Sequence, residues 1–299
     1  MRIFLVALTI ALPLLAHAQA PSTAPKAVLV TGASTGIGHE ITQRLASAGY
    51  LVYAGARKDA DLAALNAIKN VQAIRLDVTR QPDIDAAVAT ITKAGRGLHG
   101  LVNNAGVGSI GPMATMSMEE IDLMMQVNVY GPIRVTRAFL PLLIESKGRI
   151  TNIGSISGIL ASKDFNAYAM SKHAMEAFTD SLAAELAPQG VTVNIVEPGN
   201  FKSEIGASAT KRTGLETRLT DRSKYKEPVE VAAAVELALF EPKPKRRYMV
   251  TPDQREAEYT IRKQIEQLVQ LNEDQPYSYD RDALLKMLDE ALAQARPRK

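Results

Sequence analysis

Short apolar runs alternate with amphipathic stretches along the chain from residue 26 onward. The runs have the length of buried strands, and the stretches between them place apolar residues at helical spacing. Strand alternating with helix predicts a parallel sheet covered on both faces, which right-handed crossovers make doubly wound. We therefore expect an α/β fold. The predicted strands are 27–30, 51–54, 71–76, 98–102, 149–153, 191–196 and 248–250, and the predicted helices are 37–48, 61–68, 82–92, 117–144 and 167–186.

The chain divides into a short leader, one large domain and a charged tail. No linker rich in proline, glycine or serine interrupts residues 26–252, so we expect them to form a single domain. Residues 253–299 are predicted to be a helical C-terminal extension of that domain, with helices over 255–271 and 282–295.

The first 20 residues have the pattern of a secretory signal. Arg2 precedes an apolar run over 3–16, and Ala16, His17 and Ala18 form a small-x-small cleavage site. The run is shorter than a bilayer span, so residues 1–20 are predicted to be a signal peptide or an N-terminal membrane segment, followed by a leader over 21–25. A misassigned start or a buried N-terminal strand is the alternative.

Composition and charge exclude several classes of function. With 46% hydrophobic and 22% charged residues the chain is typical of a globular protein, and a net charge of +3 does not indicate a nucleic-acid partner. The absence of cysteine excludes disulfides and thiol catalysis. The four histidines include no pair at i, i+4, which argues against a histidine metal site.

A glycine-rich turn, TGASTGIG at residues 31–38, follows the first strand and opens the first helix. Glycines in such a turn let the backbone approach a pyrophosphate, whose charge the helix N-terminus favours. The same residues also match G-x-S-x-G, the nucleophile elbow of serine hydrolases, with Ser34 as the nucleophile. An elbow normally follows several strands, whereas here only the signal and the leader precede the first strand. No convincing pair of Asp and His stands near downstream strand ends.

A second constellation places a tyrosine, a lysine and a serine near one strand end. Tyr168 and Lys172 are at i, i+4 and so share a helix face, where an ammonium favours the phenolate and lets the phenol exchange a proton. Tyr259 and Lys263 have the same spacing. Only Tyr168, however, has a serine, Ser155, thirteen residues earlier and just beyond a strand. Ligands bind beyond the carboxyl ends of strands in such sheets.

These motifs together resemble those of the short-chain dehydrogenase/reductase family, in order and in spacing, over residues 26–250. The resemblance implies a single Rossmann-like doubly wound sheet of about seven strands. The branch it most resembles contains retinol, hydroxysteroid and 3-hydroxybutyrate dehydrogenases. The matching motifs are TGxxxGxG at 31–38, NNAG at 103–106, the helix asparagine Asn128, the set Ser155, Tyr168 and Lys172, and PG at 198–199.

The resemblance implies catalytic roles for four residues. Tyr168 would exchange a proton with the substrate oxygen, Ser155 would hydrogen-bond that oxygen, and Lys172 would support the tyrosine and bind the nicotinamide ribose. Asn128 would hold a water that relays protons through Lys172; a purely structural hydrogen bond is the alternative. The cofactor contacts implied are Gly32, Ser34, Thr35, Gly36, Ile37, Gly38, Arg57, Asp77, Val78, Asn104, Ala105, Gly106, Tyr168, Lys172, Pro198, Gly199 and Ser203.

The end of the second strand indicates which nicotinamide cofactor is used. An acidic residue there would bind the ribose of NAD, whereas an arginine accommodates the 2′-phosphate of NADP. By the resemblance, Ala56 stands in the place of the acid and Arg57 follows it. A guanidinium binds phosphate in a bidentate manner, so we expect NADP(H), with NAD as the alternative.

Substrate and location are less sharply indicated. We expect a lipophilic alcohol or ketone as the substrate, with a small ketone or an acyl thioester as the alternative. The expectation rests on apolar residues that either line a pocket or belong to the core: Ile110, Met113, Ile159, Leu160 and Phe201. A non-catalytic nucleotide-binding module is a further alternative. A homo-oligomer through helices 117–144 and 167–186 is a family expectation. The signal predicts export or membrane association through residues 1–20, whereas the cofactor predicts the cytoplasm.

Overall fold

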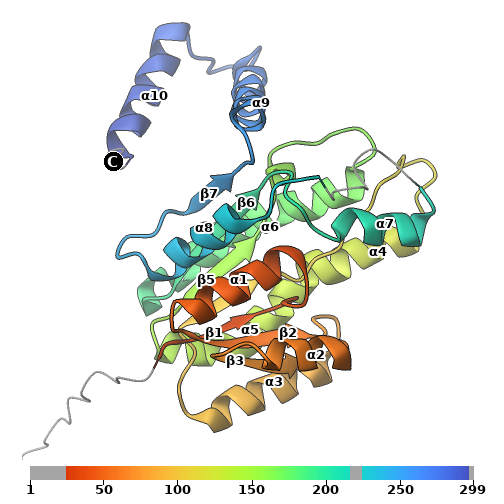
Figure 1. Ribbon diagram of the computed structural model, residues 1–299. Coiled ribbons are helices and arrows are strands. Elements are labelled where there is room, and N and C mark those ends of the chain that lie inside the picture. The colour runs from red at the N-terminus through yellow and green to blue at the C-terminus, as the bar shows by residue number, and fades with distance from the viewer. Residues whose placement is uncertain (1–24, 216–223, 296–299) are drawn as a thin grey trace, which may run out of the picture.

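The computed structural model describes residues 25–215 and 224–295, in which seven parallel strands form one sheet (Figure 1). Their order across the sheet is β3-β2-β1-β4-β5-β6-β7, which confirms the predicted doubly wound α/β fold. Each predicted strand is present, two of them with the predicted bounds and the others with bounds shifted by one or two residues. The strands are β1 (Ala27–Val30), β2 (Leu51–Ala56), β3 (Val71–Arg75), β4 (Gly100–Asn103), β5 (Arg149–Ile153), β6 (Thr192–Pro198) and β7 (Arg247–Val250).

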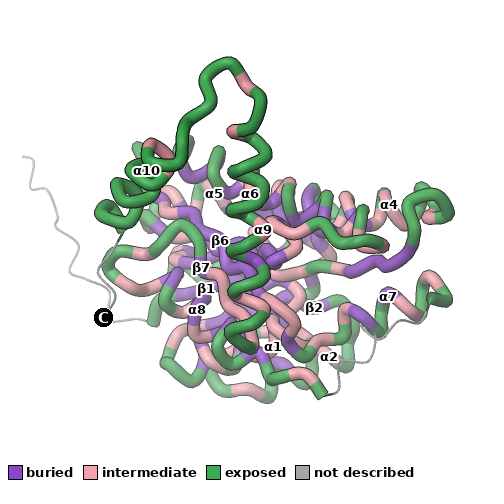
Figure 2. Tube along the Cα trace, turned by 90° about the horizontal axis from the view of Figure 1, so that it is seen from above, coloured by how far each residue is buried: buried purple, intermediate pink, exposed green. Residues whose placement is uncertain are grey.

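Helices cover both faces of the sheet and give it two cores. In β1, Val28 and Val30 contribute to one core and Ala27 and Leu29 to the other, because side chains alternate across a strand. Figure 2 shows the buried positions concentrated in this central layer. One face carries α1 (Gly36–Ser47), α2 (Asp59–Asn66) and α8 (Val229–Phe240), and the other carries α3 (Gln81–Ala94), α5 (Gly131–Glu145) and α6 (Asn166–Leu186).

The strand order reverses next to β1, which pairs with β2 on one side and β4 on the other. The crossovers that leave β1 and β4 therefore run toward opposite edges of the sheet. This divergence opens a crevice beyond the carboxyl ends of the two strands, which is where open α/β sheets bind ligands.

The helix predicted over 117–144 is interrupted by a π-helical turn. It comprises α4 (Met118–Met125), the π turn Gln126–Tyr130, and α5. Ser117 caps its start, since the Ser117 hydroxyl accepts a hydrogen bond from the Glu120 amide at 3.3 Å. The π turn contains the buried Asn128. Such turns occur frequently at functional sites.

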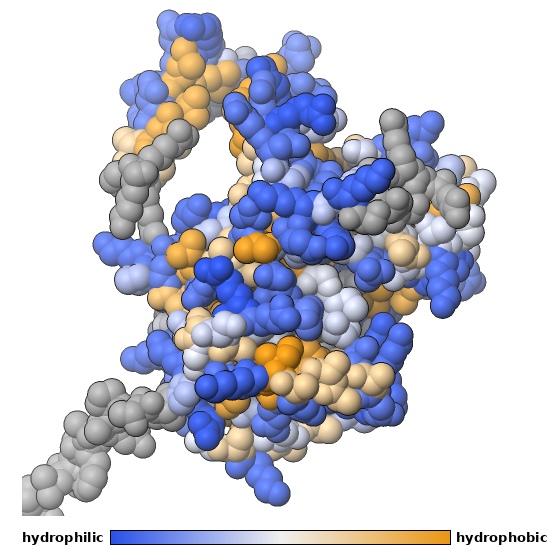
Figure 3. All heavy atoms as spheres, viewed as in Figure 1, coloured by the Kyte–Doolittle hydropathy of each residue, from blue (hydrophilic) through white to orange (hydrophobic). Residues whose placement is uncertain are grey.

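Three further helices complete the described chain. The short helix α7 (Ile205–Thr213) lies in the segment after β6, and α9 (Gln254–Asn272) and α10 (Arg281–Gln294) stand apart from the sheet (Figure 1). The predicted C-terminal helices are thus present. Figure 3 shows apolar side chains on these outer helices. Ile265, Leu268 and Leu288, which lie on α9 and α10, are each more than half exposed.

The predicted signal or membrane segment, residues 1–20, and residues 21–24 of the leader lie outside the described residues. Among the helices of the described ranges, none has both the length and the apolar character to span a bilayer.

Candidate active site

A crevice of about 890 Å³ lies at the carboxyl ends of the strands and receives residues that follow β1 to β6. This volume is within the range of small-molecule sites. Every predicted cofactor contact lines the crevice, from the glycine turn to Ser203, and so do the predicted catalytic residues Ser155, Tyr168 and Lys172. The structure thus brings together motifs that are spread over about 170 residues of sequence.

The turn after β1 has the backbone shape that a pyrophosphate site requires. Gly32 and Gly36 have φ of +64° and +53°, in the left-handed region that favours glycine. A Cβ on Gly32 would lie 2.8 Å from the Ala105 Cα, so any larger residue would collide with the chain after β4.

Within the described residues, the start of α1 has neither a side-chain cap from its N-cap residue, Thr35, nor an acidic residue in its first turn. Gly36, Ile37 and Gly38 in that turn line the crevice. Their uncapped N–H groups and the helix dipole fit an anionic diphosphate, so the residues present are suited to a dinucleotide.

The segment after β4 fixes the glycine turn from the other side. The Asn104 side chain donates to the carbonyl oxygens of Thr31 and Gly32 at 2.9 and 3.0 Å. The Thr31 hydroxyl accepts from the amides of Asn104 and Ala105 at 3.0 Å each. Two signatures far apart in sequence therefore form one rigid wall of the crevice.

The predicted catalytic residues lie at the end of β5 and on the facing side of α6. Ser155 is 8% exposed, and its Oγ accepts from the Ser157 amide at 3.0 Å. Lys172 is 7% exposed and donates from Nζ to the carbonyl oxygen of Ile153 at 2.8 Å, with the same Nζ 5.7 Å from the Tyr168 ring centroid. The strand end thus holds the ammonium beneath the phenol, while Tyr168 remains partly exposed in the crevice.

Asn128 is not among the residues that line the crevice, and its side chain is occupied by protein groups. Its Oδ1 accepts from the Val107 amide at 2.8 Å, and its Nδ2 donates to the Val107 carbonyl at 2.9 Å and to the Ser171 Oγ at 3.0 Å. The asparagine therefore ties the π turn both to the segment after β4 and to the residue before Lys172. Its predicted water relay stays a prediction.

The far end of the crevice carries two cations beyond β2. Arg57, whose side chain is 68% exposed, points its Nη1 toward Asp77 at 3.9 Å. Lys58, which the sequence motifs did not single out, also lines the crevice there, as do Asp61 and Val78.

The substrate side is lined by residues from elements that sequence reasoning largely missed. Leu160 and Phe201 line the crevice as anticipated, whereas Ile110, Met113 and Ile159 are not among its lining residues. The unanticipated lining residues are Phe165, Ile205 and Arg212, together with Glu256 and Tyr259 from α9. No local signal marks the last two, because they follow the last strand and sit in a segment whose pattern indicates only an exposed helix.

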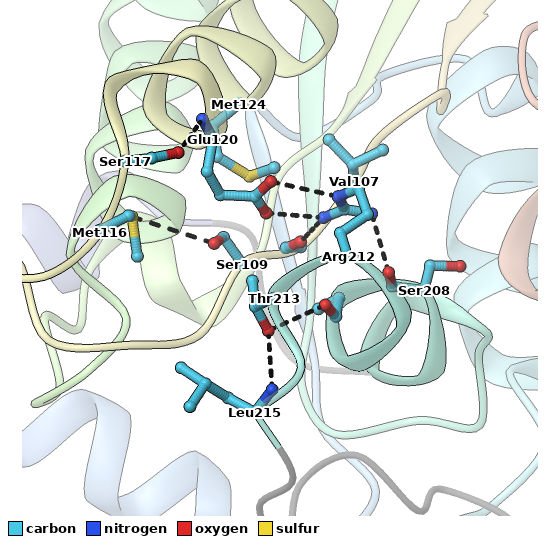
Figure 4. A network of polar contacts seen from close by, with 12 residues as sticks. Val107, Ser109, Met116, Ser117, Glu120, Met124, Ser208, Arg212, Thr213 and Leu215 are labelled. Atoms are coloured by element: carbon cyan, nitrogen blue, oxygen red, sulfur yellow. Dashed lines mark hydrogen bonds and ion pairs between the residues drawn. The ribbon is translucent and has the colours of Figure 1, made fainter.

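A polar network joins α7 to α4 on the substrate side of the crevice (Figure 4). Arg212 pairs with the Glu120 carboxylate at 2.9 Å, donates to the Ser208 carbonyl at 3.0 Å, and also donates to the carbonyl oxygen of Gly108. The Glu120 side chain, which a full capping box would direct back to the start of α4, is directed to Arg212 instead. The arginine thereby fastens α7 over the crevice.

Two neighbouring carboxyl groups, one buried and one partly buried, lie behind the catalytic residues. Glu176 is one turn beyond Lys172 on α6, and Glu197, 2% exposed, is near the end of β6. The Nε of Arg247 lies 3.1 Å from Glu176 and 3.7 Å from Glu197, while its Nη2 lies 2.6 Å from Asp180. Burial and, next, the charge of Glu176 raise the pKa of Glu197 to about 8, and burial also raises the pKa of Glu176. One guanidinium thus faces more carboxyl groups than it can neutralise, and the pair retains a proton near neutral pH.

The hydrolase alternative gains no support from the geometry. Ser34 lines the crevice, but none of the histidines in the described part of the chain does. His173 faces the Ala169 carbonyl at 2.9 Å within α6. A serine nucleophile would need a base within hydrogen-bond reach.

Comparisons with known proteins agree with this geometry. The model of the family described as short chain dehydrogenase matches residues 26–214. Over 193 residues the chain is 39% identical to the mitochondrial D-beta-hydroxybutyrate dehydrogenase of Rattus norvegicus, covering 61% of this chain and 56% of that protein. The chain thus spans only about half the length of this relative.

Two further matches cover more of both chains. The chain is 35% identical over 247 residues to the NADPH-dependent 3-dehydrocapnine reductase of Ornithobacterium rhinotracheale, covering 75% of this chain and 87% of the relative. The solved structure of a variant of actinorhodin polyketide ketoreductase with NADPH superposes with a TM-score of 0.69 and 31% identity, over 76% of this chain and 96% of the other. The protein therefore belongs to the short-chain dehydrogenase family.

Proposed function

We propose that this protein is an oxidoreductase that transfers a hydride between a nicotinamide cofactor and the carbonyl carbon of a ketone, or the matching carbon of a secondary alcohol. The observation that carries the proposal is the meeting of Ser155, Tyr168 and Lys172 with an uncapped helix N-terminus in one crevice. One part of the crevice suits an anionic dinucleotide, and the other offers a hydroxyl pair for acid–base chemistry. The relatives named above as dehydrogenases and reductases support the same class of reaction.

Bound nicotinamide would supply the hydride chemistry, and the protein would supply geometry and protons. In reduction, the Tyr168 phenol donates a proton to the substrate oxygen, and in oxidation it accepts one. The Lys172 ammonium, fixed by the Ile153 carbonyl, stabilises the phenolate that results. Because the Ser157 amide already occupies a lone pair of the Ser155 Oγ, that hydroxyl keeps its hydrogen to donate to the substrate oxygen.

Asn128 would support this set indirectly. Both hydrogens of its amide are given to Val107 and Ser171, so its side chain has no hydrogen left to donate to a relay water. The same bonds hold Ser171, next to Lys172, at a fixed place in the helix. We therefore propose that Asn128 supports the proton relay by fixing the π turn and the start of the Lys172 turn.

We further propose that NADP(H) is preferred to NAD(H). Ala56 ends β2 without a carboxylate, and the two residues that follow, Arg57 and Lys58, are cations that line the crevice. Such cations attract a 2′-phosphate, whereas an acidic residue at this point would repel it. The NADPH named for the ketoreductase structure and for the 3-dehydrocapnine reductase is consistent with this preference.

For the substrate we propose a lipophilic alcohol or ketone. Leu160, Phe165, Ile205 and Tyr259 give the substrate side of the crevice an apolar character, which favours burial of a hydrocarbon chain or ring. A small ketone or an acyl thioester is the second candidate, which the hydroxybutyrate and polyketide relatives favour. A homo-oligomer remains the proposed assembly.

The test uses the purified full-length protein in a titration with NADPH and NADH, followed by turnover on a panel of steroid or retinoid ketones, small ketones and acyl thioesters. Tyr168→Phe should lower kcat by about 100-fold or more and leave NADPH affinity unchanged, because only the proton donor is lost. Tyr277→Phe, at a position 81% exposed, is the matched control. Unchanged turnover in Tyr168→Phe would remove the proposed mechanism, and nucleotide binding without turnover would favour the non-catalytic module.

For location, we propose association with the cell envelope through residues 1–20, on sequence pattern alone. Fractionation of the full-length protein beside a variant that begins at residue 21 tests it. Equal distribution of the two forms would contradict a targeting role for the segment.

A further inference from the structure

The turn that follows β6 is held by a residue from the C-terminal extension. The amide nitrogen of Asn200 lies 3.2 and 3.1 Å from the two carboxylate oxygens of Glu256, and the Asn200 side chain donates to the same carboxylate. Both donors of Asn200 are thus satisfied by one acid on the first turn of α9. Glu256 lies 42 residues beyond the part of the chain that the family model matches.

The local structure is adapted to this contact on both sides. A Cβ on Gly199 would lie 2.5 Å from the Glu256 Oε2 and 3.1 Å from Pro252, so the glycine leaves the space that the carboxylate occupies. On the helix, Asp253 caps the start of α9 by accepting from the Glu256 amide at 2.9 Å. Thr260, fully buried, donates from its hydroxyl to the Glu256 carbonyl at 2.9 Å. The acid is therefore presented by a rigid helical turn.

The turn that Glu256 holds is part of the crevice. Residues 198–201 and 203 all line it, as do Glu256 itself and Tyr259 on the same face of α9. Other supports of the turn are the bonds from the Gly199 amide to the Val250 carbonyl at 2.8 Å and from the Lys202 amide to the Lys226 carbonyl at 2.9 Å, and the buried ring of Phe201. Without Glu256, the Asn200 amide would lose its partner between these anchors.

We propose that Glu256 is a positioning residue of the active site, which holds the turn 198–203 in the conformation that receives the nicotinamide end of the cofactor. For its ligand this inference rests on the proposed function. The carboxylate acts through the turn and touches no reacting atom. The C-terminal extension accordingly contributes to the active site of this chain through Glu256.

The test compares Glu256→Ala and Glu256→Gln with Glu258→Ala in the full-length protein. Glu258 is the matched control, since the partner of its carboxylate among the described residues is Arg262 on the same helix and its side chain is 53% exposed. A hydrogen bond to a charged acceptor is lost in Glu256→Ala, so we expect the Kd for NADPH, read from nicotinamide fluorescence, to rise about tenfold. Glu256→Gln keeps an acceptor oxygen and should fall between wild type and Glu256→Ala, and Glu258→Ala should stay within about twofold of wild type.

A second readout is independent of the cofactor. Amide hydrogen exchange at Asn200, measured without nucleotide, should become about tenfold faster in Glu256→Ala and remain unchanged in Glu258→Ala. An NADPH Kd and an Asn200 exchange rate in Glu256→Ala that both match wild type would overturn the inference, and so would a lower Tm with an unchanged Kd, since that is the result of a merely structural contact. If wild type binds no NADPH, the proposed function fails, and unchanged exchange at Asn200 then also rejects the positioning role.

Discussion

The pair of Glu176, which is partly buried, and Glu197, which is buried, predicts a specific pH dependence of stability, which Glu197→Gln should remove. The Oε1 atoms of both acids are buried, and within the described residues neither has a hydrogen-bond donor as a partner. A proton shared between the two carboxyl groups satisfies both atoms. Glutamine is neutral, has nearly the same shape, and can donate an amide hydrogen to Glu176 in place of that proton.

The direction and the size of the change in unfolding free energy with pH follow from the raised pKa of Glu197. Its pKa is about 8 in the folded protein against an ordinary value of 4.5, so the folded protein keeps a proton that the unfolded chain releases. The stabilising contribution is therefore complete below the unfolded pKa and is lost as the pH rises through the folded pKa. Over that window one proton corresponds to a loss of up to about 1.4 kcal/mol of unfolding free energy per pH unit.

The assay is urea unfolding of wild type and Glu197→Gln at a series of pH values. The unfolding free energy of the variant minus that of wild type should grow by about 2 kcal/mol between about pH 5.5 and about pH 7.5. Titrating groups that do not interact with the pair cancel in this difference. Glu185 is an exposed carboxylate on α6, the helix that carries Glu176, and Glu185→Gln should give a difference that does not change with pH. A flat difference for Glu197→Gln as well would refute the retained proton.

Three further substitutions test other parts of the crevice. Arg57→Ala should weaken NADPH binding about tenfold and leave NADH binding unchanged in fluorescence titrations, because only the contact to the 2′-phosphate is lost from an exposed guanidinium. Equal loss for both nucleotides would contradict that role. Ser155→Ala should lower kcat about 100-fold in steady-state assays with an unchanged NADPH Kd, since one donor to the substrate oxygen disappears. Arg212→Ala releases α7 from α4 and should raise the substrate KM about fivefold without affecting the NADPH Kd; an unchanged KM would show that this network does not shape the substrate side.

Much of the fold could be predicted because its determinants are local. The seven strands are short apolar runs, and the predicted crossover helices place apolar residues at helical spacing. The helix α8 is not predicted, because its sequence lacks such a local pattern. Its sequence, VEVAAAVELALF, is apolar on nearly all sides because it is buried against α1 and the sheet, so it has no amphipathic period to detect.

The π turn at Asn128 was also beyond sequence reasoning. Residues 126–130, QVNVY, fit a regular helix as well as a π turn, so the pattern predicted one helix over 117–144. What selects the π turn is tertiary: the Asn128 side chain bonds Val107 after β4 and Ser171 on α6. Inserting one extra residue into the helical ladder is compensated by these bonds, and nothing in a helical periodicity records them.

The two Tyr-x-x-x-Lys patterns show most clearly what spacing does and does not determine. Both place an ammonium near a phenol ring, with 5.7 Å from Lys172 to Tyr168 and 5.9 Å from Lys263 to Tyr259. The two patterns differ in the group that each lysine binds. Lys172 is buried and bound to the end of β5, whereas Lys263 pairs with Glu266 at 2.5 Å in solvent. A lysine committed to an exposed acid has little charge to offer its phenol, so the strand end beneath Lys172, and not the i, i+4 spacing, is what makes Tyr168 the catalytic candidate.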